Sequence, residues 1–318
     1  MGRTAKQDVL LLCLLLTLLL GLTGCKGAGY KQAVAYQEEK DYASAAAIYQ
    51  TLEDYKDSAQ RLAQCNAMLA AIGEYQSAER AANEKNVQLA AAISAAEALI
   101  AEGKKPLDDT LIPALETAVS EAKAAQTEIP AMPETAGEIE DVAEALKRID
   151  YTAVLEPLSA RQSALKHSIK QYALVDAPAE EYIIQCLETV SHVKNIAAAT
   201  EDNDPNGNLN KAGGYTAQVY FSVDLVNQAS IRGSSVIEKG TDCGGSIEVY
   251  ATPEDAEKRN IYLSAFDGTI FASGSHTVVG TVVVRTSDKL KASQQKQLET
   301  EIISVLTSVE GSDWLSPA

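Results

Sequence analysis

The stretch SAQRLAQCNAMLAAIGEYQSAERAANEKNVQLAAAISAAEALIAE, residues 58–102, decides the architecture of this chain. Its apolar and small residues return at steps of three and four positions, which is the spacing of one face of an α-helix. These residues are Leu62, Cys65, Leu69, Ile72, Tyr75, Ala78, Ala82, Leu89, Ile93, Ala96 and Ile100. A continuous helix over 58–102 would be about 67 Å long, and Gly73 is the weak point where we expect a break, if there is one.

Two further helical regions follow this stretch. Gly103 to Pro106 is a stop signal, after which the pattern predicts a helix over 108–127 and another over 136–174. We expect Pro157 to kink or divide the third region, because proline cannot donate the helical hydrogen bond. Short connections between the three regions predict an antiparallel helical bundle with coiled-coil character over 58–175.

The residues before the long helix predict a tether and a helical hairpin over 25–57. Small residues and tyrosines alternate at helical spacing around a turn at Asp41, at Ala33, Tyr36, Tyr42, Ala45, Tyr49 and Leu52. This hairpin resembles one tetratricopeptide repeat, and LEDYKDS at 52–58 resembles a hairpin of exported proteins from Gram-positive bacteria. A self-standing repeat array needs at least about three repeats. The hairpin is therefore either a cap on the bundle or a partner-binding module.

Residues 1–24 have the order of an export signal. Arg3 and Lys6 supply positive charge, and VLLLCLLLTLLL at 9–20 is an unbroken apolar run. A membrane-spanning anchor is the rival interpretation, but 9–24 would span only about 24 Å as a helix, against about 30 Å of hydrocarbon. The run ends at Leu22, Thr23, Gly24 and Cys25.

These four residues resemble the lipobox of bacterial lipoproteins. The resemblance implies that Cys25 is diacylated and becomes the mature N-terminus, because the thiolate is the nucleophile that forms the lipid thioether. Two acyl chains hold a protein on a membrane where one would be marginal. We therefore expect the plasma membrane as a partner, and a location on its outer face. An ordinary cleaved signal and an uncleaved anchor are the alternatives.

Composition excludes several classes of protein. The chain has 318 residues and a formal net charge of −17, so it lacks the basic balance that nucleic-acid binding and electrostatic docking on anionic lipid require. Hydrophobic residues make up 46%, which argues against global disorder. The length predicts more than one domain.

Residues 176–318 predict a small α+β domain, so the fold class is helices first and α+β afterwards. Strands are expected over 215–222, 246–251 and 278–285, with a fourth over 196–199. In the first of these the apolar side chains alternate with Thr216, Gln218, Tyr220 and Ser222, which predicts a half-buried strand. Helices are expected from about 180, after the capping residue Thr252, and over 292–309. One sheet covered mainly on one face by helices is the expected result.

Several motifs of this region resemble an uncharacterised, EbhA-like C-terminal domain of membrane-anchored proteins from Gram-positive bacteria. They are TEDNDPNGNLNK at 200–211, GGY at 213–215, VIEKGTD at 236–242, IEVY at 247–250, SGSH at 273–276, and RTS at 285–287 with ASQQ at 292–295. The resemblance covers about 180–307 and implies no activity.

The acidic loop is a candidate calcium site. Asp202, Asp204 and Asn206 occupy alternate positions, as the first ligands of an EF-hand loop do, but Gly213 stands where the bidentate glutamate is required. Two interpretations stay open: an Asx-rich turn without a cofactor, and a calcium loop closed by a distant carboxylate such as Asp242.

The cysteines and histidines offer two further hypotheses. Cys186 and Cys243 fall in one predicted domain and could form a disulfide, which export permits; otherwise they and Cys65 are lone thiols. Cys243 and His276 could form the nucleophile–base pair of a hydrolase. No third orienting residue is identifiable in the sequence.

The sequence as a whole predicts a non-enzymatic lipoprotein that binds or scaffolds at the cell envelope, with a protein or an envelope component as its partner. The alternatives are a Cys–His hydrolase outside the cytoplasm and a calcium-dependent recognition domain. A solute-capture component of a transporter is disfavoured, because no two-lobed α/β pattern is visible.

Overall fold

The computed structural model describes residues 26–269 and 272–310. These residues divide into two compact units, one formed by 26–91 with 123–153 and the other by 92–122 with 154–310. The helical region 58–175 therefore contributes to both units, which differs from the predicted boundaries after residues 57 and 175. Leu22, Thr23, Gly24 and Cys25 lie outside the described residues.

The first unit begins with the predicted hairpin. Its helices are α2 (Lys26–Glu38) and α3 (Tyr42–Leu52), which pack around a small core that includes Ala33, Ala45 and Tyr49. The side chain of Asp41 caps α3 by accepting a hydrogen bond from the Ser44 amide at 3.0 Å. Small residues between the helices permit their close packing, as the sequence predicts.

The long helix α4 (Ser58–Ala101) is continuous through Gly73. A glycine costs a helix interior only about 1 kcal/mol relative to alanine. The apolar face on both sides of Gly73, with Cys65, Ala71, Tyr75 and Ala78 buried, outweighs that cost.

The third predicted helix is divided, but not at Pro157. The division falls between α6 (Ala136–Lys147) and α7 (Thr152–Leu174), where the Asp150 carboxylate accepts hydrogen bonds from the Thr152 amide and hydroxyl. Pro157 lies in the second turn of α7, within a continuous helix. The capping chemistry of Asp150, rather than the proline, decides where the new helix begins.

The helix predicted over 108–127 is α5 (Leu111–Ala125), which buries Leu115, Ala118, Val119 and Ala122. The segment before it is joined to α7, because Ser168 accepts hydrogen bonds from the amides of Leu107 and Asp108. No helix within residues 26–269 and 272–310 is long and apolar enough to cross a membrane.

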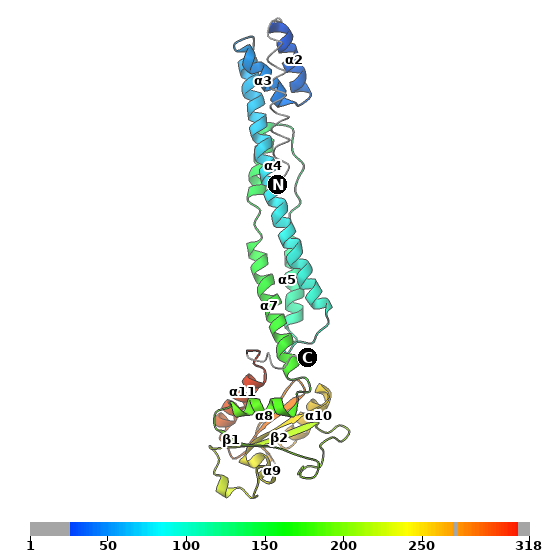
Figure 1. The fold of residues 1–318 in the computed structure, drawn as a ribbon, viewed down its shortest axis with the longest axis vertical. Coiled ribbons are helices and arrows are strands. Elements are labelled where there is room, and N and C mark those ends of the chain that lie inside the picture. Colours follow the sequence, from blue (N-terminus) through cyan, green and yellow to red (C-terminus); the bar gives the residue numbers. More distant parts are fainter. Residues whose placement is uncertain (1–25, 270–271, 311–318) are drawn as a thin grey trace. The chain divides into compact units, whose positions relative to one another are not determined.

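The second unit contains a five-stranded antiparallel sheet with the strand order β1–β2–β3–β5–β4. Figure 1 labels its first two strands, β1 and β2. Its strands are β1 (Val193–Ala198), β2 (Ala217–Val223), β3 (Gly244–Val249), β4 (His276–Val279) and β5 (Val282–Thr286). The short helical elements η1 (Gln228–Ser230), α9 (Val236–Lys239) and η2 (Gly240–Cys243) connect β2 to β3.

The prediction of one strand over 278–285 is wrong, because this stretch is a hairpin. Gly280 has a φ of +61°, which turns the chain, and β4 pairs back onto β5. The turn sits against the end of α7, where the Val175 carbonyl accepts a hydrogen bond from the Thr281 amide at 2.9 Å. Tertiary contact therefore fixes a turn that an apolar run conceals.

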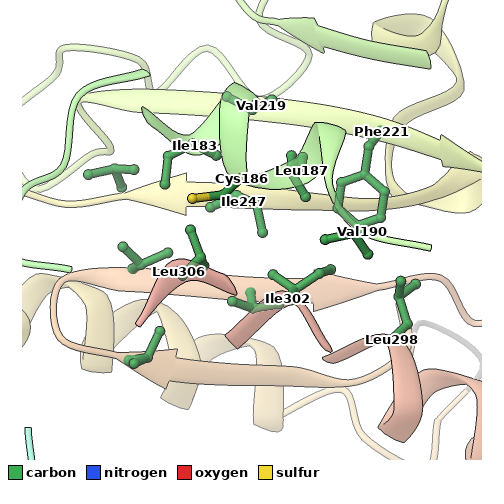
Figure 2. Close-up of a cluster of buried hydrophobic side chains, with 14 of the residues drawn as sticks. Ile183, Cys186, Leu187, Val190, Val219, Phe221, Ile247, Leu298, Ile302 and Leu306 are labelled. Carbon is green, nitrogen blue, oxygen red and sulfur yellow. The ribbon is translucent and has the colours of Figure 1, made fainter. Parts of the chain in front are cut away.

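One face of the sheet forms the main apolar core of the second unit. Helices α8 (Glu180–Glu188) and α11 (Ala292–Leu306) cover this face and pack on β2, β3 and β5 (Figure 2). Figure 2 shows the side chains that meet there, among them Ile183, Leu187, Val219, Phe221, Ile247 and Ile302.

The opposite face is covered in part by α10 (Pro253–Ser264), whose Ala256 and Leu263 pack with Val283 of β5. Thr252 caps this helix as predicted, by accepting a hydrogen bond from the Asp255 amide at 3.2 Å. The expectation that β2 is only half-buried is wrong, because Gln218, Tyr220 and Ser222 are buried as well.

Candidate ligand-binding site

Polar side chains gather on the sheet face that α10 partly covers. The strand register places Tyr220 beside Ser246, Ser246 beside Arg285, and Gln218 beside Glu248. Directly opposed residues of an antiparallel pair project to the same face. The result is a buried polar layer across β2, β3 and β5, behind which lies the apolar core.

Glu248 is the centre of this layer, and its side chain is 0% exposed. Arg259 of α10 donates two hydrogen bonds to it, from Nε at 2.8 Å and from Nη2 at 3.0 Å. Arg285 donates a third from Nη1 at 2.8 Å, and the Tyr250 hydroxyl donates a fourth at 2.9 Å. Both carboxylate oxygens therefore accept two hydrogen bonds each, which is what a buried charge requires.

The two guanidinium groups keep Glu248 ionised. Burial opposes ionisation, but the hydrogen bonds and positive charges of Arg259 and Arg285 outweigh it and hold the pKa of this carboxyl below its ordinary value. Burial, followed by the charge of Glu248, raises the pKa of Tyr250, so its hydroxyl stays a donor at neutral pH. Glu248 thus holds Arg259 and Tyr250 in fixed positions.

A second carboxylate, Asp204, organises the loop after β1. It accepts hydrogen bonds from the amides of Asn206 at 3.0 Å, Asn208 at 2.6 Å and Leu209 at 2.9 Å, and from the Tyr215 hydroxyl at 2.5 Å. Partial burial opposes its ionisation, but these donors prevail and lower the pKa of Asp204. Asp204 therefore fixes the ring of Tyr215.

Tyr215, Tyr250 and Arg259 line one cavity of about 240 Å³. The two tyrosine rings meet edge to face, with centroids 6.2 Å apart. Asp255 and Lys258 of α10 complete the lining on one side, and Gly213 and Gly214 on another. Hydrogen bonds to Glu248 and Asp204 thus hold three walls of the cavity, so little ordering is left for a ligand to impose.

The polar layer next to the cavity retains unused hydrogen-bonding capacity. The side-chain amide of Gln218, the Ser246 hydroxyl and the Nε of Arg285 are buried and have no partner among the described residues. Buried polar atoms are ordinarily hydrogen-bonded, to protein or to water.

The predicted calcium ligands do not converge. Asp202 is exposed, Asp204 is occupied by four donors, and the side-chain amide of Asn206 lies 3.4 Å from the Tyr215 hydroxyl. Asp242, the distant carboxylate proposed to close the loop, lies 3.7 Å from the Lys289 ammonium. Within residues 26–269 and 272–310 no group of three or more His, Cys, Asp or Glu side chains could hold a metal ion. Calcium binding stays a prediction.

Of the two possibilities for Cys186 and Cys243, a disulfide or lone thiols, the structure has the second: both are free and lie against different neighbours. The thiol of Cys186 points at the Val305 carbonyl of α11, at 3.7 Å, whereas that of Cys243 donates to the Gly240 carbonyl at 3.1 Å. Burial raises the pKa of Cys243 to about 11. Membership of one domain does not bring two cysteines within bonding distance.

Cys243 and His276 are also kept apart. Cys243 directly precedes β3, whereas His276 begins β4, and β5 lies between these strands. The His276 ring contacts Asn260 at 2.7 Å and Asp267 at 3.3 Å. The hydrolase hypothesis therefore lacks the nucleophile–base contact on which it depends.

Sequence reasoning missed Glu248, Arg259 and Arg285. A signal was present: Glu248 interrupts the apolar strand run IEV, and Arg285 interrupts VVVRT. Charged residues are rarely buried unless they are paired, so two opposite charges inside two strands indicate a buried ion pair. Arg259 gave no such signal, because arginine on a helix is ordinary on a surface.

No protein-family model, no curated protein and no solved structure matches this chain. The geometry alone defines the class: helices followed by an α+β unit that carries a preorganised polar cavity. The resemblances to lipoproteins and to an EbhA-like domain stay predictions that rest on the motifs quoted above.

Proposed function

We propose that this chain is a non-enzymatic, lipid-anchored binding or scaffold protein on the outer face of a Gram-positive plasma membrane. Its C-terminal α+β unit binds a protein or an envelope component in the cavity beside Tyr215, Tyr250 and Arg259. One observation carries this proposal: Glu248 and Asp204, each saturated with donors, hold the cavity walls in place.

The chemistry of the cavity favours binding over catalysis. Lys258 pairs with Asp255 at 2.8 Å, and Arg259 pairs with Glu248, so both cations are held in position. The pKa of Cys243, the nucleophile of the hydrolase hypothesis, is about 11, which leaves little thiolate at neutral pH. Cations and aromatic rings in fixed positions suit binding of a ligand without a chemical change in it.

The anchor is supported by the export signal and by the resemblance of residues 22–25 to a lipobox. Two acyl chains on Cys25 would hold the protein firmly, whereas the net charge of −17 gives it no electrostatic attraction to anionic lipid. The lipid, rather than the protein surface, would then determine the location.

The anchor is tested with labelled palmitate in a Gram-positive host. The full chain should incorporate the label and sediment with membranes, whereas Cys25→Ser should lose both properties and Cys65→Ser should keep them. Cys65 is a matched control because it is buried and lies far along the sequence from the lipobox. Label on the Cys25→Ser variant would overturn the assignment of the lipid site.

Binding is tested by retention of the full chain, in detergent, on purified cell envelopes. Ala212 lines the cavity and is exposed, so Ala212→Trp should fill the cavity and abolish retention. Ala229 is exposed but does not line the cavity, and Ala229→Trp should bind as the unaltered chain does. Equal retention of all three would place recognition elsewhere.

A further inference from the structure

We infer that the cavity beside Arg259 selects small ligands that carry a free carboxylate, and that Arg259 is the residue that binds it. This inference rests on the proposed function, since it names the ligand class of the same cavity.

The charges that line the cavity leave a surplus of one positive charge. Lys258 and Arg259 are cationic, and Asp255 is anionic. Behind Arg259, the charges of Glu248 and Arg285 cancel. Asp204 lies behind Tyr215 and keeps its negative charge while it accepts four hydrogen bonds, so the positive surplus is confined to the residues that line the cavity. In a chain whose net charge is −17, this surplus is a local exception that favours an anion.

Arg259 has donors to spare. A guanidinium carries five N–H donors, and Arg259 uses Nε and Nη2 on Glu248. Nη1 makes no hydrogen bond within the described residues. Together with Nη2 it forms the second edge of the planar, fork-shaped guanidinium group, beside the edge of Nε and Nη2 that faces Glu248. Such an edge binds a carboxylate through two parallel hydrogen bonds. Glu248 holds the guanidinium in place, so its free edge is preorganised.

The same charges favour a carboxylate over a phosphate dianion. One surplus positive charge balances a monoanion, whereas a second negative charge would meet Asp255 in the cavity wall and Asp204 behind Tyr215. The tyrosine rings and Gly213 and Gly214 offer contact for an uncharged body. The volume of about 240 Å³ is below the roughly 300–1,000 Å³ of common ligand pockets. The end of a short peptide is a ligand of this size.

Calorimetry on the full chain in detergent tests this inference with matched probes. The first probe is N-acetyl-alanyl-alanine, and the second is its C-terminal amide, which has the same shape without the charge. The acid can accept charge-assisted hydrogen bonds from Arg259 and the amide cannot, so we expect the acid to bind at least about tenfold more tightly than the amide. Inorganic phosphate is the third probe and should bind more weakly than the acid.

Three variants assign the effect to the cavity. Arg259→Lys should weaken binding of the acid about tenfold and leave the amide unaffected, because a lysine cannot supply the fork. Lys258→Gln should weaken it a few-fold without unfolding, since the Lys258 side chain is 76% exposed. Arg232→Lys is the matched control, because Arg232 is exposed and does not line the cavity. The unfolding temperature of each variant verifies that it is folded.

Two results would overturn the inference. Equal affinities for acid and amide, or no binding of either, would exclude the carboxylate, and tighter binding of phosphate would replace it by a different anion. The proposed function fails separately, because it depends on whether Ala212→Trp blocks retention on envelopes. If Ala212→Trp blocks retention on envelopes but Arg259→Lys does not, the cavity remains the binding site and its selectivity for carboxylates is ruled out.

Discussion

The two faces of the sheet in the second unit are stabilised by different interactions, although the same strands form both. On one face Val219, Phe221 and Ile247 pack against α8 and α11, and dispersion and the hydrophobic effect hold them. On the other face Gln218, Glu248 and Arg285 are just as deeply buried, yet they are polar. Alternation along a strand lets one set of residues form the apolar core while the next set forms a buried polar layer.

The comparison teaches where stability and specificity reside. An apolar face tolerates substitutions of similar volume. A polar face does not, because each buried group needs a partner of defined geometry. Glu248 has four donors, whereas Gln218 and Ser246 have none among the described residues. The polar face is therefore fully hydrogen-bonded at Glu248, whereas Gln218 and Ser246 beside it are equally buried and have no such partners in the described part of the chain.

The largest expected effect comes from breaking the ion cluster of the polar face. Glu248→Gln would leave Arg259 and Arg285 buried without their counter-charge, and we expect a loss of about 3–5 kcal/mol in the free energy of unfolding. Urea denaturation followed by circular dichroism measures this loss. The triple variant Glu248→Leu, Arg259→Leu, Arg285→Met should lose less than Glu248→Gln alone, since no unpaired charge remains. A larger loss in the triple variant would contradict this account of the polar face.

The apolar face is tested by making a cavity in it. Ile302 is 0% exposed in the core beneath α11, so Ile302→Ala should cost roughly 2–5 kcal/mol. Ile261 on α10 is 62% exposed, and Ile261→Ala should stay within about 0.5 kcal/mol. Thermal unfolding of both variants gives the comparison, and similar losses would mean that α11 contributes little to the core.

The turn between β4 and β5 keeps the two faces apart, because a slip of one residue would exchange them. The backbone at Gly280 has a φ of +61°, which residues other than glycine rarely adopt. The Cβ that Gly280→Ala adds would also lie 2.4 Å from the Val175 carbonyl oxygen. We expect a loss of about 2–3 kcal/mol. Gly268 also has a positive φ, of +73°, but a Cβ there meets no atom within 4 Å. Gly268→Ala should therefore cost about 1 kcal/mol, and equal losses would show that the contact with Val175 is unimportant.

The smallest effect separates two interpretations of the acidic loop that borders the polar face. Asp204→Asn should cost about 1–2 kcal/mol through weakened hydrogen bonds, and the loss should be the same in calcium and in chelator. Asp202→Asn is the matched control and should change little, because Asp202 is exposed. Differential scanning calorimetry measures both. A stabilisation by calcium that either substitution removes would restore the calcium hypothesis.

The helical part of the fold was predictable because its signals are local. Apolar spacing predicts α4 and α5, and Thr252 is the capping residue that the sequence predicts for α10. Tertiary contacts and local hydrogen bonds decide what these patterns leave open. Packing along α4 carries that helix through Gly73, and α7 begins after Asp150, whose carboxylate accepts hydrogen bonds from Thr152, rather than at Pro157.

The sheet was predictable in part. Alternation located β2 and β3, but it left open whether their polar side chains meet solvent or a cover. Nothing local says that α10 and the loop around Asp204 close over Gln218 and Tyr220. The hairpin of β4 and β5 was hidden for a similar reason, since one glycine in an apolar run is compatible with both a strand and a turn.

The sequence by itself determined the helices, their caps and the α then α+β order, because the periodicity of side chains and the chemistry of helix ends act over a few residues. Tertiary structure alone decided that Glu248, Arg259 and Arg285 meet, that Asp204 holds Tyr215, and that Cys186 and Cys243 do not pair. Those outcomes depend on strand register and on which segment covers which face. Both arise from contacts between residues far apart in the chain, which no local pattern encodes.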